Sequence, residues 1–275
     1  MNSKHNFLRI AILDMYCHVY NQGMHCIHQI IGRTEKKFNL SISIEVFEVR
    51  TSNRLPGLDF DIYISTGGPG SPLESNEPWE LNYRSWLNEL LQYNSTSKPS
   101  DKKFAFFICH SFQLACRMLN FGKISQRAQK SEGIFEIERT LTGKKDTVFH
   151  SLQDNFWVVD SREYQVTNPN HDSIESMGGN ILAWEKISDQ EVAHRAVMAM
   201  RFNTEMMGTQ FHPEADAEGL LKYIQNKIEN EKDTSNWKIA SAKAGQHLES
   251  IERTYQTILP EFLKQAIEQK SVGYD

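Results

Sequence analysis

The sequence has few cysteines, no basic excess and no long apolar run, and each shortage argues against a class of protein. Its 275 residues include 4 cysteines, too few for a disulfide scaffold, and no CxxC pair suggests zinc. The net charge of −5 lacks the basic balance that a nucleic-acid-binding surface usually carries. No apolar run approaches the roughly 18 residues of a membrane span. We therefore expect a soluble cytoplasmic protein that binds no nucleic acid or membrane and holds no metal or other cofactor.

The first half alternates strand and helix patterns. With 39% hydrophobic and 24% charged residues, the chain has a globular composition, and its length fits one α/β domain with an appendage or two small domains. Apolar, β-branched runs predict strands, the first of which carries Arg9 and Asp14 and does not resemble a signal peptide. The alternation is typical of a mostly parallel sheet covered by helices. The expected strands are Phe7–Asp14, Ile42–Val49, Asp61–Ser65 and Phe104–Cys109, and the expected helices lie in Val19–Phe38, Trp79–Tyr93 and Ser111–Leu119.

The second half changes to short strands joined by brief turns, which predict a meander that extends the sheet or lies across its end. These strands are Gly133–Thr140, Tyr164–Thr167, Asn180–Glu185, His194–Phe202 and Glu205–Phe211. Helical patterns follow at Ala217–Glu231 and from Trp237 to Lys270, where Pro260 is expected to break the helix. We expect two helices in a hairpin against the body or a partner. Residues 1–230 would form the α/β domain and residues 231–275 a helical extension.

Three segments, each directly after a predicted strand, contain residues suited to chemistry. The paired glycines of Thr66–Gly70 let a substrate approach backbone N–H groups that can hold an oxyanion. Cys109 lies at a strand-to-helix junction, where a nucleophile is exposed and the helix N-terminus favours a thiolate. His212 suits a general base whose tautomer Glu214 fixes across a proline. Each segment alone also has a plain interpretation, as a tight turn, a buried small hydrophobe and a polar turn.

Together, and in this order, the three segments resemble the class I (triad-type) glutamine amidotransferases. That family has a Gly-Gly-Pro turn, then G-x-C-x-G-x-Q, then F-H-P-E. In this sequence, Phe106–Gln113 corresponds to the second motif and Phe211–Glu214 to the third. Val166–Asp172, followed by Ile181–Trp184, is similar to a segment of GMP-synthase-like members. The resemblance covers about residues 7–230 and implies a flavodoxin-like α/β fold with a mostly parallel central sheet flanked by helices.

The resemblance implies a catalytic triad. Cys109 would attack the side-chain amide carbon of glutamine and form a γ-glutamyl thioester. His212 would deprotonate the thiol and protonate the departing ammonia, while Glu214 orients the imidazole. Water would then release glutamate, as in the glutaminase domain of GMP synthase.

The resemblance also implies the groups that hold the substrate. The N–H groups of Gly68 and His110 would form the oxyanion hole, and Gln113 matches the family position that touches the substrate glutamine. Gly67 and His171 are further expected substrate-binding residues, although a polar turn is an equal interpretation of the segment around His171.

Three residues at the strand-to-helix junction around Cys109, hereafter the elbow, depart from the family pattern. Phe107 and Ser111 replace glycines that relieve crowding there, which leaves open a catalytically impaired binding or regulatory relative. His110 is a second candidate base, because a Cys-His pair at this elbow serves as a dyad in PfpI-type peptidases of related fold. The Gly-Gly-Pro and F-H-P-E segments favour His212 as the base and leave only the backbone of His110 a role.

The partner and the acceptor stay open at this stage. The chain has no phosphate-binding Gly-rich Lys-Ser/Thr segment and no room for a synthetase. It would serve either as an amidotransferase subunit for a separate synthetase or as a free-standing hydrolase of γ-glutamyl peptides or γ-glutamyl amines. Both reactions pass through the same thioester. The C-terminal helices could form a docking surface, a lid or a homodimer interface.

Overall fold

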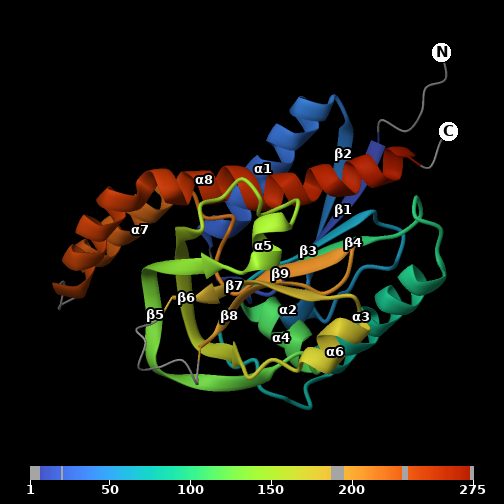
Figure 1. Cartoon of the computed structure of the whole chain (residues 1–275), viewed down its shortest axis with the longest axis horizontal. Helices are drawn as coiled ribbons and strands as arrows, with labels where there is room; N and C mark the ends of the chain where they lie inside the picture. Colours follow the sequence, from blue (N-terminus) through green and yellow to red (C-terminus); the bar gives the residue numbers. More distant parts are fainter. Residues whose placement is uncertain (1–6, 20, 187–194, 231–234, 273–275) are drawn as a thin grey trace.

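A mixed sheet organises the molecule (Figure 1). The computed structural model describes residues 7–19, 21–186, 195–230 and 235–272. The strands are β1 (Phe7–Asp14), β2 (Ser41–Glu48), β3 (Ile62–Ser65), β4 (Phe104–Ile108), β5 (Lys123–Arg139), β6 (Asn155–Thr167), β7 (Asn180–Glu185), β8 (Val197–Arg201) and β9 (Met206–Thr209). The helices are α1 (Gln22–Phe38), α2 (Val49–Ser52), α3 (Pro78–Thr96), α4 (His110–Met118), α5 (Leu141–Lys145), α6 (His171–Ser176), α7 (Ala217–Asn230) and α8 (Ser235–Val272).

The parallel part of the sheet places the three predicted segments side by side. The described strands form one nine-stranded sheet in the order β2-β1-β3-β4-β9-β8-β7-β5-β6, in which β2, β1, β3, β4 and β9 pair in parallel. Every residue of β4 is buried, as expected for a central strand covered on both faces. Because parallel strands end at one edge of a sheet, the loops after β3, β4 and β9 meet there.

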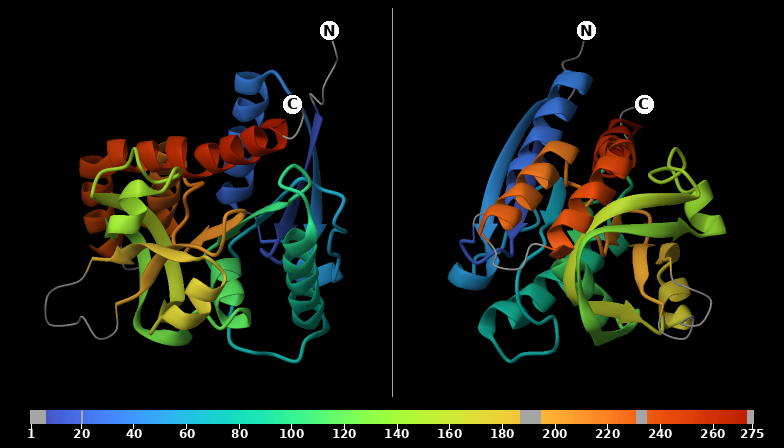
Figure 2. Two further views of the ribbon diagram at one scale, coloured as in Figure 1. Left: turned by 45° about the vertical axis from the view of Figure 1, so that its right-hand side comes forward. Right: turned by 90° about the vertical axis from the view of Figure 1, so that its left-hand side faces the viewer.

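The antiparallel part differs from the sequence prediction in the length of two strands. β5 begins at Lys123 and β6 at Asn155, well before the predicted starts of Gly133 and Tyr164. The added residues of β5 are largely polar, whereas those of β6 include the apolar run Phe156–Val159. The two strands pair antiparallel, with a register shift between Gln126 and Ser131. Backbone pairing with β6, and not intrinsic propensity, makes the added residues of β5 a strand. The hairpin curves away from the rest of the sheet (Figure 2).

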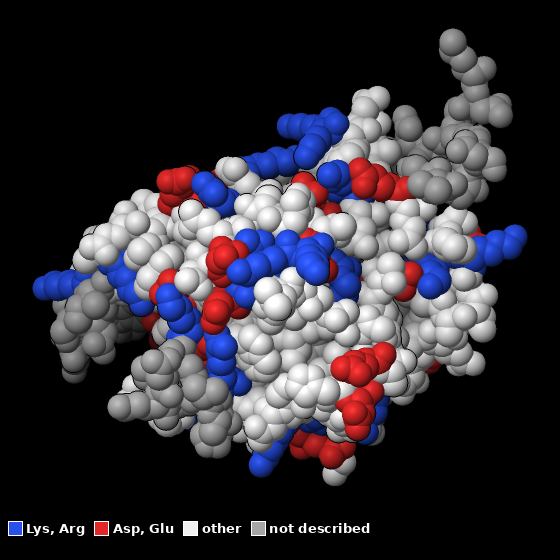
Figure 3. All heavy atoms as spheres, in the orientation of Figure 1, with Lys and Arg blue, Asp and Glu red and all other residues white. Residues whose placement is uncertain are grey.

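Helices cover both faces of the sheet, which confirms the predicted fold class (Figure 2). Helices α1 and α8 contribute to one buried apolar cluster, and α3 and α4 to a cluster on the opposite face. The short helices α2, α5 and α6 were not predicted, because a helix of one or two turns shows no apolar periodicity. On the face of the molecule seen in Figure 3, basic and acidic side chains lie close to one another.

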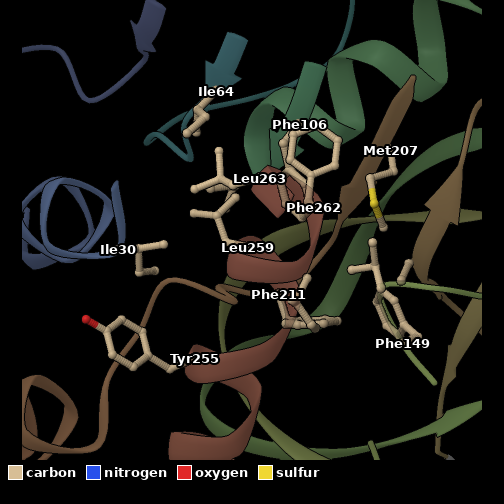
Figure 4. Close-up of a cluster of buried hydrophobic side chains, with 14 of the residues drawn as sticks. Ile30, Ile64, Phe106, Phe149, Met207, Phe211, Tyr255, Leu259, Phe262 and Leu263 are labelled. Atoms are coloured by element: carbon tan, nitrogen blue, oxygen red, sulfur yellow. The ribbon is translucent and has the colours of Figure 1, made fainter. Parts of the chain in front are cut away.

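The prediction that Pro260 breaks the last helix is wrong. Helix α8 continues from Ser235 to Val272 with Pro260 inside it. The helix buries Tyr255 and Phe262 together with several neighbours in the core beside Phe106 (Figure 4). The burial of several large side chains at about 1.5–3 kcal/mol each offsets the roughly 3 kcal/mol cost of an internal proline.

The C-terminal helices pack on the body of the same chain. α7 and α8 share a small apolar cluster that includes Leu220 and Ile251, and α8 also shares the core of the α/β part. A domain boundary after residue 230 and a homodimer through these helices stay predictions. Within the described ranges, no helix is long and apolar enough to cross a membrane, and no group of three or more His, Cys, Asp or Glu residues could hold a metal ion.

Candidate active site

The loops at the carboxyl edge of the parallel strands surround a cavity of about 750 Å³. The hairpin of β5 and β6 and the helix α7 form its other walls. Most of the residues singled out from the sequence line this cavity: Gly68, Cys109, His110, Gln113, His212 and Glu214. The sequence reasoning thus brought together residues separated by more than a hundred positions, because each follows a strand of the same sheet edge.

Cys109 occupies a sharp turn between β4 and α4. Its backbone has φ 48° and ψ −100°, a conformation that is rare for a residue with a side chain. The Cys109 N–H donates to the Thr209 carbonyl oxygen at 2.8 Å, and its own carbonyl accepts from the Gln113 N–H at 3.0 Å. Such strain persists only where the surroundings fix it, and it is common at catalytic nucleophiles.

Phe107 fits at the elbow because its neighbour on β9 is a glycine. Phe107 pairs with Gly208 across the sheet. A Cβ at Gly208 would lie 2.6 Å from the Phe107 carbonyl oxygen and 2.8 Å from a ring carbon of Phe112. The Phe107 ring is fully buried and packs against Phe202 with ring centroids 5.5 Å apart. The space that the family pattern provides by a glycine on β4 is provided here by a glycine on the adjacent strand.

Ser111, the second departure from the family pattern, connects the elbow to β3. Its hydroxyl donates to the Ser65 carbonyl oxygen at 2.7 Å and accepts from the Ile108 N–H at 2.9 Å. The side chain is fully buried. A glycine at this position would leave the Ile108 N–H without this partner, so the serine braces the turn that carries Cys109.

His212 and Glu214 form a hydrogen-bonded pair in the turn after β9. His212 Nδ1 lies 2.8 Å from Glu214 Oε1, which leaves Nε2 available to the thiol of Cys109. Burial disfavours the charged imidazole, but the charges of Glu214 and Cys109 outweigh it and hold the pKa of His212 well above its ordinary value. The geometry therefore suits an imidazolium paired with a thiolate.

Gly67 is buried between His212 and Cys109. A Cβ at this position would lie 2.9 Å from His212 Cε1 and 3.5 Å from the Cys109 Cβ. Gly67 itself does not line the cavity. Its expected substrate-binding role stays a prediction, and any larger residue here would push His212 and Cys109 apart.

The side chain of His110 is enclosed behind the elbow. It is 1% exposed, and burial, together with the nearby cations of Arg50 and Arg117, lowers the pKa of His110 to about 3. The ring is neutral at physiological pH and cannot stabilise a thiolate as an imidazolium. This position favours the interpretation in which only the backbone of His110 takes part.

The expected oxyanion donors lie beside Cys109 in the cavity wall. Within the part of the chain that the structure describes, neither the Gly68 N–H nor the His110 N–H donates a hydrogen bond to another protein atom. Gly68 packs so closely on the end of β1 that a Cβ would lie 2.3 Å from the Met15 carbonyl oxygen. Gln113 also faces the cavity and donates from Nε2 to the Tyr164 carbonyl oxygen at 2.9 Å.

His171 is not brought to the cavity. It is exposed at the first position of α6 and does not line the site. Asn168 has a positive φ of 47°, and the Asn170 side chain caps α6, so the chain turns here and a helix begins. The structure therefore places His171 on the surface at a helix start, outside the cavity that the other expected site residues line.

Sequence reasoning missed two buried residues of the cavity wall. Tyr16 follows β1 at the same sheet edge as the other loops, which was the signal that could have found it. Burial, then the charges of Glu214 and Cys109, raises the pKa of Tyr16 well above its ordinary value. Arg162 lies on the unpredicted length of β6, and no sequence signal marked it. Its Nε donates to Asp160 at 2.7 Å.

Comparisons with known proteins identify a family and several similar folds. The family model of glutamine amidotransferase class-I matches residues 23–230. A glutamine amidotransferase from Thermotoga maritima is similar in structure, with a TM-score of 0.67 and 14% identity over 95% of this chain and 98% of that chain. No curated protein matches the sequence.

Two further solved structures are similar at low identity. A candidate GMP synthase subunit from Thermoplasma acidophilum has a TM-score of 0.57 and 13% identity, with 98% of both chains covered. The glutaminase domain of CTPS from Trypanosoma brucei, with bound acivicin, has a TM-score of 0.59 and 12% identity over 95% of this chain and 94% of that chain. At these identities the likeness establishes the fold.

Proposed function

Because the chain belongs to the class I glutamine amidotransferase family, we propose that it hydrolyses the side-chain amide of glutamine through a thioester on Cys109. The observation that carries the proposal is the His212–Glu214 hydrogen bond of 2.8 Å in the same cavity as Cys109 on its strained turn. Nucleophile, base and orienting carboxylate are the parts that a thiol-dependent amide hydrolysis requires.

The first half-reaction forms the thioester. The Cys109 sulfur attacks the amide carbon, and the carbonyl oxygen takes the negative charge beside the N–H groups of Gly68 and His110. The carbon–nitrogen bond then breaks as the proton held by His212 passes to the leaving nitrogen, which departs as ammonia. Glu214 keeps Nε2 of His212 directed at the reacting atoms by accepting from Nδ1.

The second half-reaction restores the starting state. His212 accepts a proton from a water molecule, whose oxygen attacks the thioester carbon and again places charge on the carbonyl oxygen. The carbon–sulfur bond breaks, glutamate leaves, and the Cys109 sulfur again lies beside the protonated His212. Both half-reactions use the same two N–H donors.

For the use of the ammonia, we propose a separate synthetase as partner. The candidate GMP synthase subunit and the CTPS glutaminase domain among the similar structures support this proposal. The second candidate is hydrolysis of a γ-glutamyl peptide or amine. The cavity favours this candidate, because its volume of about 750 Å³ exceeds the space that a glutamine molecule occupies. The cavity also extends to Tyr223 and Asn226 on α7.

Glutamate release from glutamine and from a panel of γ-glutamyl peptides and amines tests the proposal. Cys109→Ala is the blank, and Cys116→Ala, which removes a buried thiol from the same helix, is the matched control. We expect release that requires Cys109 and persists in Cys116→Ala. Full activity in Cys109→Ala would reject the nucleophile. Rapid release from one γ-glutamyl conjugate, with glutamine a poor substrate, would select the second candidate.

A further inference from the structure

We propose that Arg50 is a positioning residue that holds the loop after β3, residues 66–70, in the shape that exposes its oxyanion-binding N–H. The proposal rests on the proposed function, since it concerns the same oxyanion hole. Arg50 belongs to α2, the single turn after β2, and does not line the cavity. It would act through the loop and not on the substrate.

The guanidinium group of Arg50 bridges two loops at the sheet edge. Its Nη1 donates to the Met15 carbonyl oxygen at 3.4 Å and also to the Pro69 carbonyl oxygen. Met15 follows β1, whereas Pro69 is part of the loop after β3. The planar group with its several donors suits such a bridge, because the ammonium of a lysine is a single point charge.

The loop requires a hydrogen-bond partner that fixes its shape, because its glycines allow several backbone conformations. Gly67 and Gly68 precede Pro69, and Gly70 follows with φ +93°, a conformation that glycine adopts without cost. Such a chain loses much conformational entropy when it is fixed in one arrangement. A hydrogen bond to the Pro69 carbonyl opposes rotation of the peptide units next to Gly68.

Arg50 is itself fixed in place. Its guanidinium carbon lies 5.1 Å from the ring centroid of Trp79, which belongs to α3. Within the described ranges, Arg50 forms no ion pair with a carboxylate. Its positive charge thus stays uncompensated next to the oxyanion loop, and it also contributes to the lowered pKa of His110. A cation behind both expected N–H donors favours negative charge in front of them.

The stretch between residues 66–70 and α3 has a separate anchor. The Glu80 carboxylate accepts from the Ser75 N–H at 3.1 Å and from the Ser75 hydroxyl at 2.7 Å. Its other oxygen accepts from Arg117 on α4 at 2.7 Å. Because this anchor does not involve Arg50, loss of Arg50 frees the glycine-rich end and leaves the remainder of the loop attached.

The test compares Arg50→Met with Arg54→Met. Arg54 lies four residues on, packs its guanidinium 5.3 Å from the Phe47 ring centroid and pairs with Glu45 at 3.3 Å, without touching the loop. We expect Arg50→Met to lower kcat about 10–100-fold, less than the roughly 10²–10³-fold loss of a direct oxyanion donor. KM should change less than about twofold, because ground-state binding does not use the oxyanion hole.

Alkylation of Cys109 by iodoacetamide distinguishes a defect in the loop from a defect at the elbow. This reaction forms no oxyanion, so its rate in Arg50→Met should equal that in the wild type. A parallel fall in alkylation rate and kcat would place the defect at the elbow and overturn the proposal. An unchanged kcat in Arg50→Met, or an equal loss in Arg54→Met, would also overturn it.

Amide hydrogen exchange decides the proposal independently of turnover. Exchange in the peptide that covers residues 66–70 should be at least about tenfold faster in Arg50→Met than in the wild type or Arg54→Met. Unchanged exchange overturns the proposal, whatever the activity. If the wild type releases no glutamate but exchange accelerates in Arg50→Met, the proposed function fails while the role of Arg50 in holding the loop stands.

Discussion

The elbow after β4 and the turn after β9 each bring a histidine to Cys109, and the two regions treat it in opposite ways. At the elbow, burial and the cations of Arg50 and Arg117 lower the pKa of His110 to about 3. In the turn, the charges of Glu214 and Cys109 raise the pKa of His212. One residue type thus has two charge states within one site. Neighbours from distant elements, and not adjacency to the nucleophile in the sequence, decide which histidine can serve as the base.

The sharpest test of this difference is substitution of each histidine by asparagine. We expect His212→Asn to lower kcat/KM by about 10³-fold, because it removes the group that transfers the proton. His110→Asn should cost at least about 100-fold less, since its ring is neutral and enclosed. Steady-state glutamate release measures both. Near-normal activity of His212→Asn, with loss in His110→Asn, would reverse the roles of the two regions.

Glu214→Gln should have the next largest effect, a loss of about 10²-fold that is smaller than that of His212→Asn. Glutamine can still orient the imidazole, but it removes the charge that contributes most to raising the pKa of His212. The imidazolium should then lose its proton at lower pH, and the alkaline limb of the kcat/KM profile should shift to lower pH. An alkaline limb at the wild-type position would show that Glu214 does not set the charge state of His212.

The same substitution has an effect on stability whose sign follows from linkage. The folded-state pKa of His212 lies above its unfolded value of about 6.5. The stabilisation from the charged imidazole is therefore complete below about pH 6.5 and is lost as the pH rises through the raised pKa. Urea unfolding at several pH values should show this loss in the wild type and a smaller one in Glu214→Gln.

Gly208→Ala tests the contact that joins the two regions. The added methyl group would lie 2.6 Å from the Phe107 carbonyl oxygen, so β4 and β9 must separate or tilt. We expect a loss of about 1–3 kcal/mol in the free energy of unfolding. Gly245→Ala in α8, where a Cβ meets nothing within 4 Å, is the matched control and should be neutral or stabilising. Equal stability of the two variants would mean that Phe107 does not depend on Gly208 for space.

A further expected effect concerns acid stability at the elbow. The pKa of His110 is lowered from 6.5 to about 3, so between these values the unfolded chain binds a proton that the folded protein does not. Stability therefore falls as the pH drops through this window, by up to about 1.4 kcal/mol per pH unit. His110→Asn should remove this contribution. An acid-unfolding curve with the wild-type slope would mean that His110 is not held neutral.

Much of the parallel region was predictable because its signals are local. β1 has the predicted bounds, and β4 differs by one residue. Apolar, β-branched runs bounded by polar residues mark such strands without reference to the remainder of the chain. Cys109, His212 and Glu214 followed from the same pattern, since they stand at the ends of predicted strands.

The antiparallel region was less predictable because its structure depends on partners. The largely polar added residues of β5 form a strand through pairing with β6, and Arg162 reaches the cavity from the added length of β6. Pro260 stays helical because its neighbours in α8 bury large side chains in the core. The residues next to Cys109 in the sequence do not show how Phe107 and Ser111 fit. Gly208 on β9 leaves space beside Phe107, and the Ser65 carbonyl oxygen accepts the hydrogen bond of the Ser111 hydroxyl.

By itself, the sequence determined which residues stand at the ends of the parallel strands, and hence that Cys109, His212 and Glu214 lie near one another. Periodicity and turn residues are properties of neighbouring positions, so they can be read without coordinates. Only the tertiary structure decided that His212 is charged and His110 is not, and that His171 lies outside the site. Charge state and available space depend on burial and on groups far away in the chain, and these meet only when the chain is folded.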